Sequence, residues 1–176
     1  MNNRQAGTVE HIHIAEVEGG SVLSLQAADA IAGVGLAGDR YAKGKGFWPD
    51  DGESRDLTLV EAEAIEGLAA SGITLAPGES RRNITTRGIR LNDLVGKEFL
   101  VGAVRARGTE LCEPCMHLVA LTRKPLLQPM VHRGGLRADL LTSGTIHVGD
   151  PILLIDEVGL LPDGAEPGLQ VVDHGA

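Results

Sequence analysis

Apolar and polar residues alternate in several short stretches of this chain, and a period of two is the pattern of a half-buried β-strand. The first such stretch covers residues 8–17 and ends at Glu18-Gly19-Gly20. Another, residues 99–104, leads into the segment that holds both cysteines, and we predict one strand there. Further strands are expected at residues 57–60, 133–141, 145–148 and 152–155. Short strands joined by glycine turns predict a mainly β fold, a closed antiparallel β-barrel with a few short helices.

Two stretches have helical spacing instead. In residues 61–70 an apolar face is followed by Ser71-Gly72, and glutamates occupy the front half, where a helix dipole favours them. After the second cysteine, apolar residues at 118–121 have short helical spacing, which Lys124-Pro125 ends. We therefore predict one clear helix and one short helix.

Composition sets the size and character of the core. The chain has 176 residues, of which 43% are hydrophobic, and this suffices for one domain with a substantial core. Only 2% are aromatic, so the core must be aliphatic, and the 24 glycines favour many tight turns over long helices. We expect a single domain over residues 1–158 and a loose tail over residues 159–176, where the hydrophobic period is lost.

Charge and cysteine content exclude several classes of protein. A net charge of −8 is unsuited to nucleic acid or to an anionic membrane surface, because both need a broad basic face. The first residues have no apolar signal region, and no stretch reaches the roughly 18 apolar residues of a membrane helix. Two cysteines are too few for a disulfide framework, so we expect a cytoplasmic protein with reduced thiols.

Both cysteines lie in the segment Cys112-Glu113-Pro114-Cys115, between a predicted strand and a short helix. Four uses of such a pair compete. A structural zinc site usually has four ligands, and besides the two cysteines only His117 or His132 is available as a further ligand. A thioredoxin-like redox pair needs a βαβ pattern that the surrounding sequence lacks. Covalent haem attachment needs histidine where Met116 stands.

The fourth use is a reactive thiolate for sulfur transfer or for binding a soft metal ion. It requires partial exposure and nearby positive charge. Pro114 fixes the backbone before Cys115, and N–H groups at the start of the following helix stabilise an anion. Glu113 opposes this, because a neighbouring carboxylate disfavours a thiolate. For Cys112 the role of a buried structural cysteine stays open.

A basic segment offers the positive charge that such a thiolate needs. Residues 79–90 hold four arginines beside Asn83 and two threonines. Arg81 and Arg82 are adjacent, so on a strand they would point to opposite faces and one would point inward. An inward arginine needs a partner, either an acid such as Asp39 or a bound anion. A basic edge strand that discourages aggregation is the alternative.

Three further features each have two interpretations. Residues 33–38 have Gly-x-Gly-x-x-Gly spacing, but no helix pattern follows, so we predict a loop in which Asp39-Arg40 joins two loops by an ion pair or orients a ligand. His11 and His13 would share a strand face as metal ligands do, but no third ligand is evident, and we expect two solvent-facing histidines. Trp48, the only tryptophan, would cover a pocket or pack against the barrel wall.

Four motifs follow one another along the chain. Residues 35–41 read Gly-Leu-Ala-Gly-Asp-Arg-Tyr, residues 77–84 read Pro-Gly-Glu-Ser-Arg-Arg-Asn-Ile, and residues 113–118 read Glu-Pro-Cys-Met-His-Leu. The fourth comprises residues 134–138 and 149–151. Together they resemble the Gly-x-x-Gly-Asp-Arg-His/Tyr, Pro-Gly-x-x-Arg-Arg-Asn-Ile and Pro-Cys motifs and the closing strands of the MOSC domain family. Each motif alone is weak, but their order is specific.

The resemblance implies a β-barrel of the pyruvate-kinase type with one functional cysteine. In the family this cysteine is thought to carry sulfane sulfur from a pyridoxal-phosphate-dependent cysteine desulfurase, or to ligate molybdenum in a bound molybdopterin cofactor. Some relatives use that cofactor, with electrons from a reductase, to reduce N-hydroxylated bases. Pyridoxal phosphate is therefore expected on a partner desulfurase and not on this chain.

Carried over to this sequence, the resemblance makes Cys115 the catalytic residue and the molybdenum ligand. Cys112 is a second thiol that would resolve a persulfide into a disulfide. A guanidinium suits the phosphate of the pterin. The residues assigned to cofactor binding are Arg81, Arg82, Asn83, Asp39 and Arg40.

Overall fold

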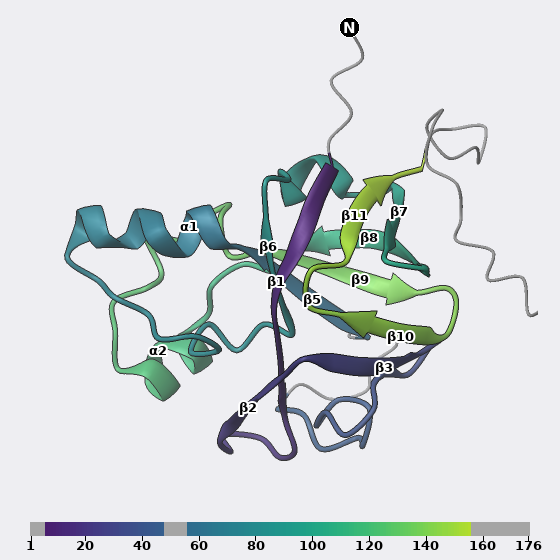
Figure 1. Cartoon of the computed structure of the whole chain (residues 1–176). Helices are drawn as coiled ribbons and strands as arrows, with labels where there is room; N and C mark the ends of the chain where they lie inside the picture. The colour runs from purple at the N-terminus through teal and green to yellow at the C-terminus, as the bar shows by residue number, and fades with distance from the viewer. Residues whose placement is uncertain (1–5, 48–55, 156–176) are drawn as a thin grey trace, which may run out of the picture.

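The computed structural model describes residues 6–47 and 56–155, and these residues form a closed barrel of seven strands (Figure 1). Around the barrel the order is β1 (Ala6–Ala15), β11 (Pro151–Leu154), β7 (Glu98–Val101), β8 (Val104–Leu111), β9 (Leu136–Leu140), β5 (Leu57–Glu61) and β6 (Ile84–Arg87). The ring closes because β1 pairs with both β6 and β11. The prediction of a mainly β chain folded as a closed barrel is confirmed.

One pairing around the barrel, between β5 and β6, is parallel, and the other six are antiparallel. Parallel neighbours need a crossover, which residues 62–83 provide. The crossover contains α1 (Ala62–Gly67), the 3-10 helix η1 (Leu68–Ser71) and the turn with Arg81 and Arg82. The helix predicted at residues 61–70 is thus confirmed, with a tighter last turn.

The remaining strands lie outside the ring. β2 (Val22–Leu25) extends the sheet beyond β1, and a separate small sheet consists of β10 (Gly144–His147), β3 (Ala27–Ile31) and β4 (Gly35–Leu36). The loop with Asp39 and Arg40 follows directly after β4. The small sheet therefore fixes where this loop begins.

Aliphatic side chains fill the barrel, as the composition predicts. In this buried cluster, Phe99 is the only aromatic residue among those the structure describes. Its fully buried neighbours include Ile12, Leu57, Leu59, Ile84, Leu91, Leu94 and Leu136. Burial of this many branched side chains is the main stabilising contribution to the fold.

The single strand predicted at residues 99–104 is wrong. Gly102 and Ala103 form a two-residue turn between β7 and β8, with Gly102 at φ +59°, and Val101 pairs with Val104. Val101 and Val104 both point into the core. A hairpin with so short a turn leaves the apolar pattern almost unbroken, so periodicity alone did not reveal it.

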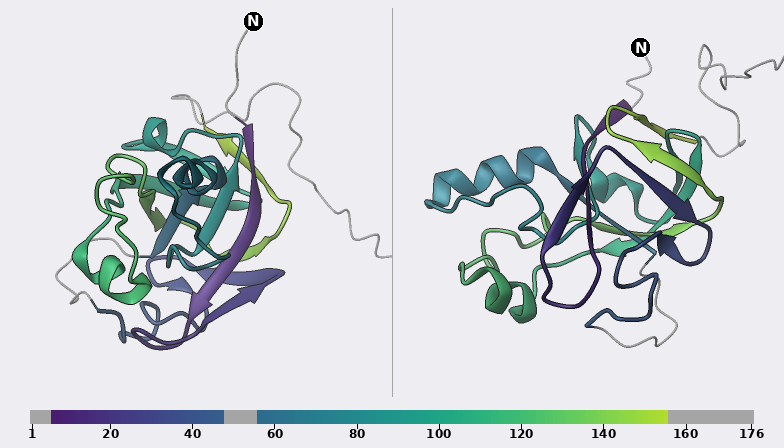
Figure 2. Two further views of the ribbon diagram at one scale, coloured as in Figure 1. Left: turned by 90° about the vertical axis from the view of Figure 1, so that its left-hand side faces the viewer. Right: turned by 60° about the horizontal axis from the view of Figure 1, so that its bottom comes forward.

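A second apolar cluster lies outside the barrel, between the crossover and α2 (Met116–Thr122), which occupy the same side of the molecule (Figure 2). Its buried members are Val60, Leu68, Ile73, Leu75, Leu118, Leu126 and Met130. This cluster anchors the short helix that follows the cysteines. The 3-10 helix η2 (Leu91–Leu94) completes the helical elements within the described ranges, and none of these helices has the length and apolar character to cross a membrane.

Two sequence expectations fall outside the described ranges. Trp48 belongs to residues 48–55, and the expected tail at 159–176 belongs to residues 156–176. Both stay predictions.

Gly135→Ala is expected to prevent β5 and β9 from pairing. A Cβ there would lie 1.9 Å from the Leu59 carbonyl oxygen, and Gly135 has φ +116°. The free energy of unfolding should fall by more than about 4 kcal/mol, measured by urea denaturation. Gly96→Ala is the matched control, because Gly96 has φ +76° but no atom within 4 Å of the added carbon. It should cost only about 1–2 kcal/mol, and equal losses would contradict the steric argument.

Candidate functional site

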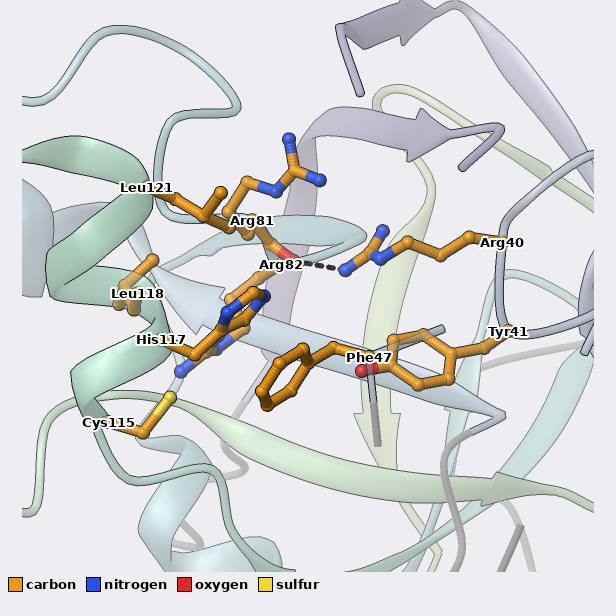
Figure 3. Close-up of a pocket in the computed structure, with 9 residues that line it drawn as sticks. All are labelled: Arg40, Tyr41, Phe47, Arg81, Arg82, Cys115, His117, Leu118 and Leu121. Atoms are coloured by element: carbon orange, nitrogen blue, oxygen red, sulfur yellow. Dashed lines mark hydrogen bonds between the residues drawn. The ribbon is translucent and has the colours of Figure 1, made fainter. Parts of the chain in front are cut away.

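One pocket brings together three segments that are far apart in the sequence. It lies between α2, the turn at residues 77–82 and the loop at residues 39–47 (Figure 3). Its volume is about 60 Å³. That volume holds a phosphate-sized group and is well below the roughly 300 Å³ of a pocket for a drug-sized ligand. The lining residues are Arg40, Tyr41, Phe47, Arg81, Arg82, Cys115, His117, Leu118 and Leu121.

Cys115 is at the junction between extended chain and helix, as the sequence predicts. It is the N-cap of α2, with φ −134° and ψ 165°, and its side chain makes no capping hydrogen bond. Its backbone carbonyl accepts from Val119 N at 3.1 Å, and Leu118 is buried in the second apolar cluster. The half-buried thiol therefore faces the pocket, on the α2 side (Figure 3).

Arg81 contributes a guanidinium to the same pocket from a turn. The strand expected around it is wrong, because β6 begins only at Ile84 and Arg81 has a left-handed backbone with φ +63°. Its N–H donates to the Gly78 carbonyl at 2.9 Å, and its Nη1 donates to the Gly20 carbonyl at 2.6 Å. Partial burial and then the nearby Arg40 guanidinium lower the pKa of Arg81. Two cations held this close favour an anion between them.

Arg82 is the inward arginine that the sequence predicts, but its partner is not Asp39. The side chain is buried and bonds backbone carbonyls. Its guanidinium donates to three backbone carbonyls, those of Gly134 at 2.9 Å, Cys112 at 2.9 Å and Ser80 at 3.3 Å. Carbonyl oxygens satisfy the donors of this buried cation, so it joins the arginine turn to the cysteine segment.

Asp39 and Arg40 act as a connected pair. Asp39 is buried, and its Oδ1 accepts from Ala15 N at 3.1 Å and from Arg40 Nη1 at 3.2 Å. Its Oδ2 accepts from Tyr41 N at 3.2 Å, and Arg40 Nη2 donates to the Arg81 carbonyl at 3.4 Å. The carboxylate thus holds Arg40 at the pocket and lies behind it. The ion pair joins adjacent residues of one loop, and the bonds with Ala15 N and the Arg81 carbonyl connect this loop to other segments.

Asn83 is buried away from the pocket lining. Its Oδ1 accepts from Thr58 N at 3.1 Å and from Thr58 Oγ1 at 3.0 Å, and its Nδ2 donates to the His13 carbonyl at 3.2 Å. These bonds link the crossover to β5 and β1. Of the five residues assigned to cofactor binding, three arginines line the pocket and Asp39 and Asn83 support it from behind.

Cys112 has a different environment from Cys115. It is 6% exposed and is not part of the pocket lining. Burial acts to lower the pKa of Arg137, but the neighbouring Cys112 and Glu110 outweigh it and raise that pKa. The burial agrees with a structural cysteine, and a role as resolving thiol stays a prediction.

Sequence reasoning did not assign five of the lining residues to a site: Tyr41, Phe47, His117, Leu118 and Leu121. The rings of Phe47 and His117 are stacked, with centroids 3.7 Å apart and planes 10° apart, and His117 Nε2 lies 3.4 Å from Glu18 Oε1. The available signals were the position of Phe47 beside Trp48 and of His117 two residues after Cys115. The Phe47–His117 stack forms one wall of the pocket (Figure 3).

Other histidines lie away from this pocket. His132 is exposed and pairs with Glu113, its Nδ1 lying 3.0 Å from Oε1. Within the described ranges, no three residues among His, Cys, Asp and Glu converge to hold a metal ion. The expectation of two solvent-facing histidines on β1 is wrong for His13, which is buried, and holds only for the half-exposed His11. His13 is buried because the turn at residues 77–82 covers the outer face of β1.

Arg82→Lys is expected to lower the free energy of unfolding by about 2–4 kcal/mol, because an ammonium group cannot reproduce the guanidinium fork to three carbonyls. Urea denaturation measures the loss. Arg105→Lys is the control, since Arg105 is an exposed arginine paired with Glu98 on the barrel surface, and about 0.5 kcal/mol is expected there. Similar losses for the two variants would show that Arg82 does not carry this connection.

Comparison with known proteins agrees with the fold and with the order of the motifs. The sequence matches the MOSC domain over residues 49–153, more than half of the chain. Among curated proteins, no sequence matches. The structure is similar to that of the YUAD protein from Bacillus subtilis, with 17% identity, a TM-score of 0.72, and coverage of 88% of this chain and 98% of that one.

Two YiiM structures are also similar. For YiiM from Geobacillus stearothermophilus the identity is 14%, the TM-score 0.64, and the coverage 85% of this chain and 75% of that one. For YiiM from Escherichia coli the identity is 16%, the TM-score 0.60, and the coverage 90% of this chain and 72% of that one. Structural similarity at these low sequence identities shows that the fold is shared. The sequence match over residues 49–153 shows the family. The chain belongs to the MOSC domain family.

Proposed function

We propose that this protein binds molybdenum cofactor at the pocket of Cys115 and uses it to reduce N-hydroxylated compounds. One observation carries the proposal: beside Arg82, whose donors bond carbonyls, a thiol and two further guanidinium groups from separate segments line the same small cavity. These groups belong to Cys115, Arg40 and Arg81. Family membership adds to this, because MOSC domains are associated with molybdenum cofactor.

The residues present fit the cofactor in kind. A thiolate is a soft ligand of the type that suits molybdenum, and Cys115 would be that ligand. The paired guanidiniums of Arg40 and Arg81 suit a phosphate, because each is a planar fork of donors. At about 60 Å³, the cavity has room for one end of such a cofactor and not for the complete pterin.

When bound, the cofactor supplies a two-electron reduction that removes oxygen from the substrate as water, with electrons from a reductase. The reaction also consumes two protons. His117 lines the pocket two residues from Cys115, and histidine exchanges protons near neutral pH. Glu18 orients this imidazole through its contact with Nε2. Arg82 holds the backbone on both sides of the site, so it would position Cys115, and its side chain also lines the pocket.

The first test is the molybdenum content of protein purified from a host that makes the cofactor. Wild type and Cys112→Ser should retain molybdenum, and Cys115→Ser should lose it together with N-reductive activity. Arg81→Gln should weaken retention about tenfold, as the loss of one charge-assisted hydrogen bond predicts. A metal-free wild type, together with a Cys115→Ser variant of unchanged activity, would rule out this function.

A second candidate function rests on the small volume of the cavity, which suits a sulfur atom better than a pterin. In this alternative Cys115 is a sulfur carrier. Its thiolate attacks the outer sulfur of a persulfide on a cysteine desulfurase, the sulfur–sulfur bond of the donor breaks, and the donor cysteine leaves as a thiolate. Pyridoxal phosphate stays on that partner. No net oxidation occurs, since one persulfide replaces another.

Mass spectrometry tests the carrier function. Incubation with a desulfurase and free cysteine should add one sulfur atom to Cys115 in wild type and in Cys112→Ser, and none in Cys115→Ser. If Cys112 resolves the persulfide, its thiolate attacks Cys115 Sγ, the persulfide bond breaks and the outer sulfur leaves as sulfide. Wild type should then proceed to an internal disulfide that Cys112→Ser cannot form. Absence of any added sulfur in the Cys112→Ser protein would exclude the carrier function.

A further inference from the structure

His13 is a buried polar side chain that the proposed chemistry does not use. It is 3% exposed, and neither Nδ1 nor Nε2 has a hydrogen-bond partner. Buried polar atoms in folded proteins nearly always have a partner, so an unpartnered imidazole calls for an explanation. Its surroundings supply one.

The turn at residues 77–82 rests directly on this ring. Gly78 has φ +79°, and a Cβ added to it would lie 2.8 Å from His13 Cδ2 and 2.6 Å from Val22 Cγ1. Only glycine allows so close an approach in this backbone conformation. The imidazole is therefore the surface on which the turn is packed.

The same turn positions Arg81 in the pocket. The carbonyl of Gly78 accepts from the N–H of Arg81 at 2.9 Å. At the end of the turn, the N–H of His13 donates to the Asn83 carbonyl at 2.7 Å, and Asn83 Nδ2 donates back to the His13 carbonyl. A displacement of Gly78 by the ring would thus move the backbone that carries Arg81.

Groups facing His13 offer it no compensating acid. Burial and then the positive charge of protonated His11, whose ring centroid is 5.8 Å away, lower the pKa of His13. The turn also carries Glu79, but that carboxylate is bonded to Lys124 Nζ and to Ala76 N. From β2, residues 22–25 bring no charged side chain.

The two arginines of the turn are engaged elsewhere. Arg81 bonds the Gly20 carbonyl, and Arg82 bonds the carbonyls of Gly134, Cys112 and Ser80. Both are cations and would repel a second charge beneath them. The packing around His13 is therefore compatible with a neutral imidazole and unfavourable for a protonated one.

We propose that His13 is a positioning residue for Arg81 that responds to protons: the neutral ring supports the turn at residues 77–82, and the protonated ring displaces it. Protonation needs this movement, because both ring nitrogens are shielded from solvent. The cationic side of the pocket is then complete at neutral pH, and Arg81 leaves it more often in acid. That consequence rests on the proposed anion site, whereas the support of the turn does not.

The direction of the pH dependence follows from linkage. In the opened state His13 titrates near its usual value of 6.5, and in the closed state it titrates lower. The free energy that favours the closed turn over the open one is therefore fully present above pH 6.5. It decreases as the pH falls below 6.5. The ratio of open to closed turn should rise about tenfold for each pH unit until the lower value is reached.

Hydrogen exchange on the full chain tests the proposal. Amides of residues 76–82 should open more often at pH 5.5 than at pH 7.5, by up to about tenfold after correction for intrinsic rates, while amides of β7 and β8 should not. His13→Gln should abolish this difference, and His11→Gln, on the same strand, should keep it. An unchanged turn in wild type, equal changes throughout the barrel, or an undiminished effect in His13→Gln would overturn the proposal.

Two further measurements keep the outcome decisive. If His13→Gln does not fold, the ring of His13 in wild type is followed by NMR, and titration near 6.5 without movement of the turn amides would overturn the proposal. Sulfate, which stays doubly charged over this range, should bind more weakly at pH 5.5 in wild type, in proportion to the fall in the closed fraction and by at most about tenfold, but not in His13→Gln. If sulfate binds neither protein but the exchange result is as expected, the proposed anion site is contradicted. The role of His13 in supporting the turn is then still supported.

Discussion

The buried guanidinium of Arg82 is the interaction on which the site depends. It joins the arginine turn at Ser80 to the cysteine segment at Cys112 and to the entry of β9 at Gly134. The last two are already linked by the bond from Cys112 N to the Gly135 carbonyl. A cation can be buried here only because the carbonyls satisfy its donors. The same contacts keep a second arginine and a thiol on opposite sides of one cavity.

The topology of the barrel explains why these segments meet. The parallel pair β5 and β6 requires a long connection, and this crossover carries both α1 and the arginine turn. An apolar cluster outside the barrel packs the crossover against α2, which follows Cys115. The loop after β4 adds Arg40, held by the buried Asp39. The pocket is thus a product of connections between strands, while the strands themselves form the scaffold.

This arrangement also orders the residues of the site by role. Cys115, Arg40 and Arg81 face the cavity and carry the chemistry proposed for it. Arg82, Asp39 and Asn83 hold those groups in place through bonds to the backbone. His13 belongs to the second group, because it lies beneath the turn of Arg81 and lines no part of the cavity. Sulfur chemistry and phosphate binding both require such fixed charges, since a thiolate or phosphate gains most from cations that need not move.

The sequence by itself determined the closed β-barrel, the aliphatic core, the helix at residues 61–70 and the place of Cys115 at the start of a short helix, because these depend on local period, composition and motif order. Only the tertiary structure decided that Arg82 bonds carbonyls, that Asn83 and Asp39 stand behind the pocket, and that His13 is buried. It also revealed the hairpin at Gly102 and the stack of Phe47 on His117. The physical reason is that a side chain's partner and burial depend on segments distant in sequence, whereas strand and helix periods are written in neighbouring residues.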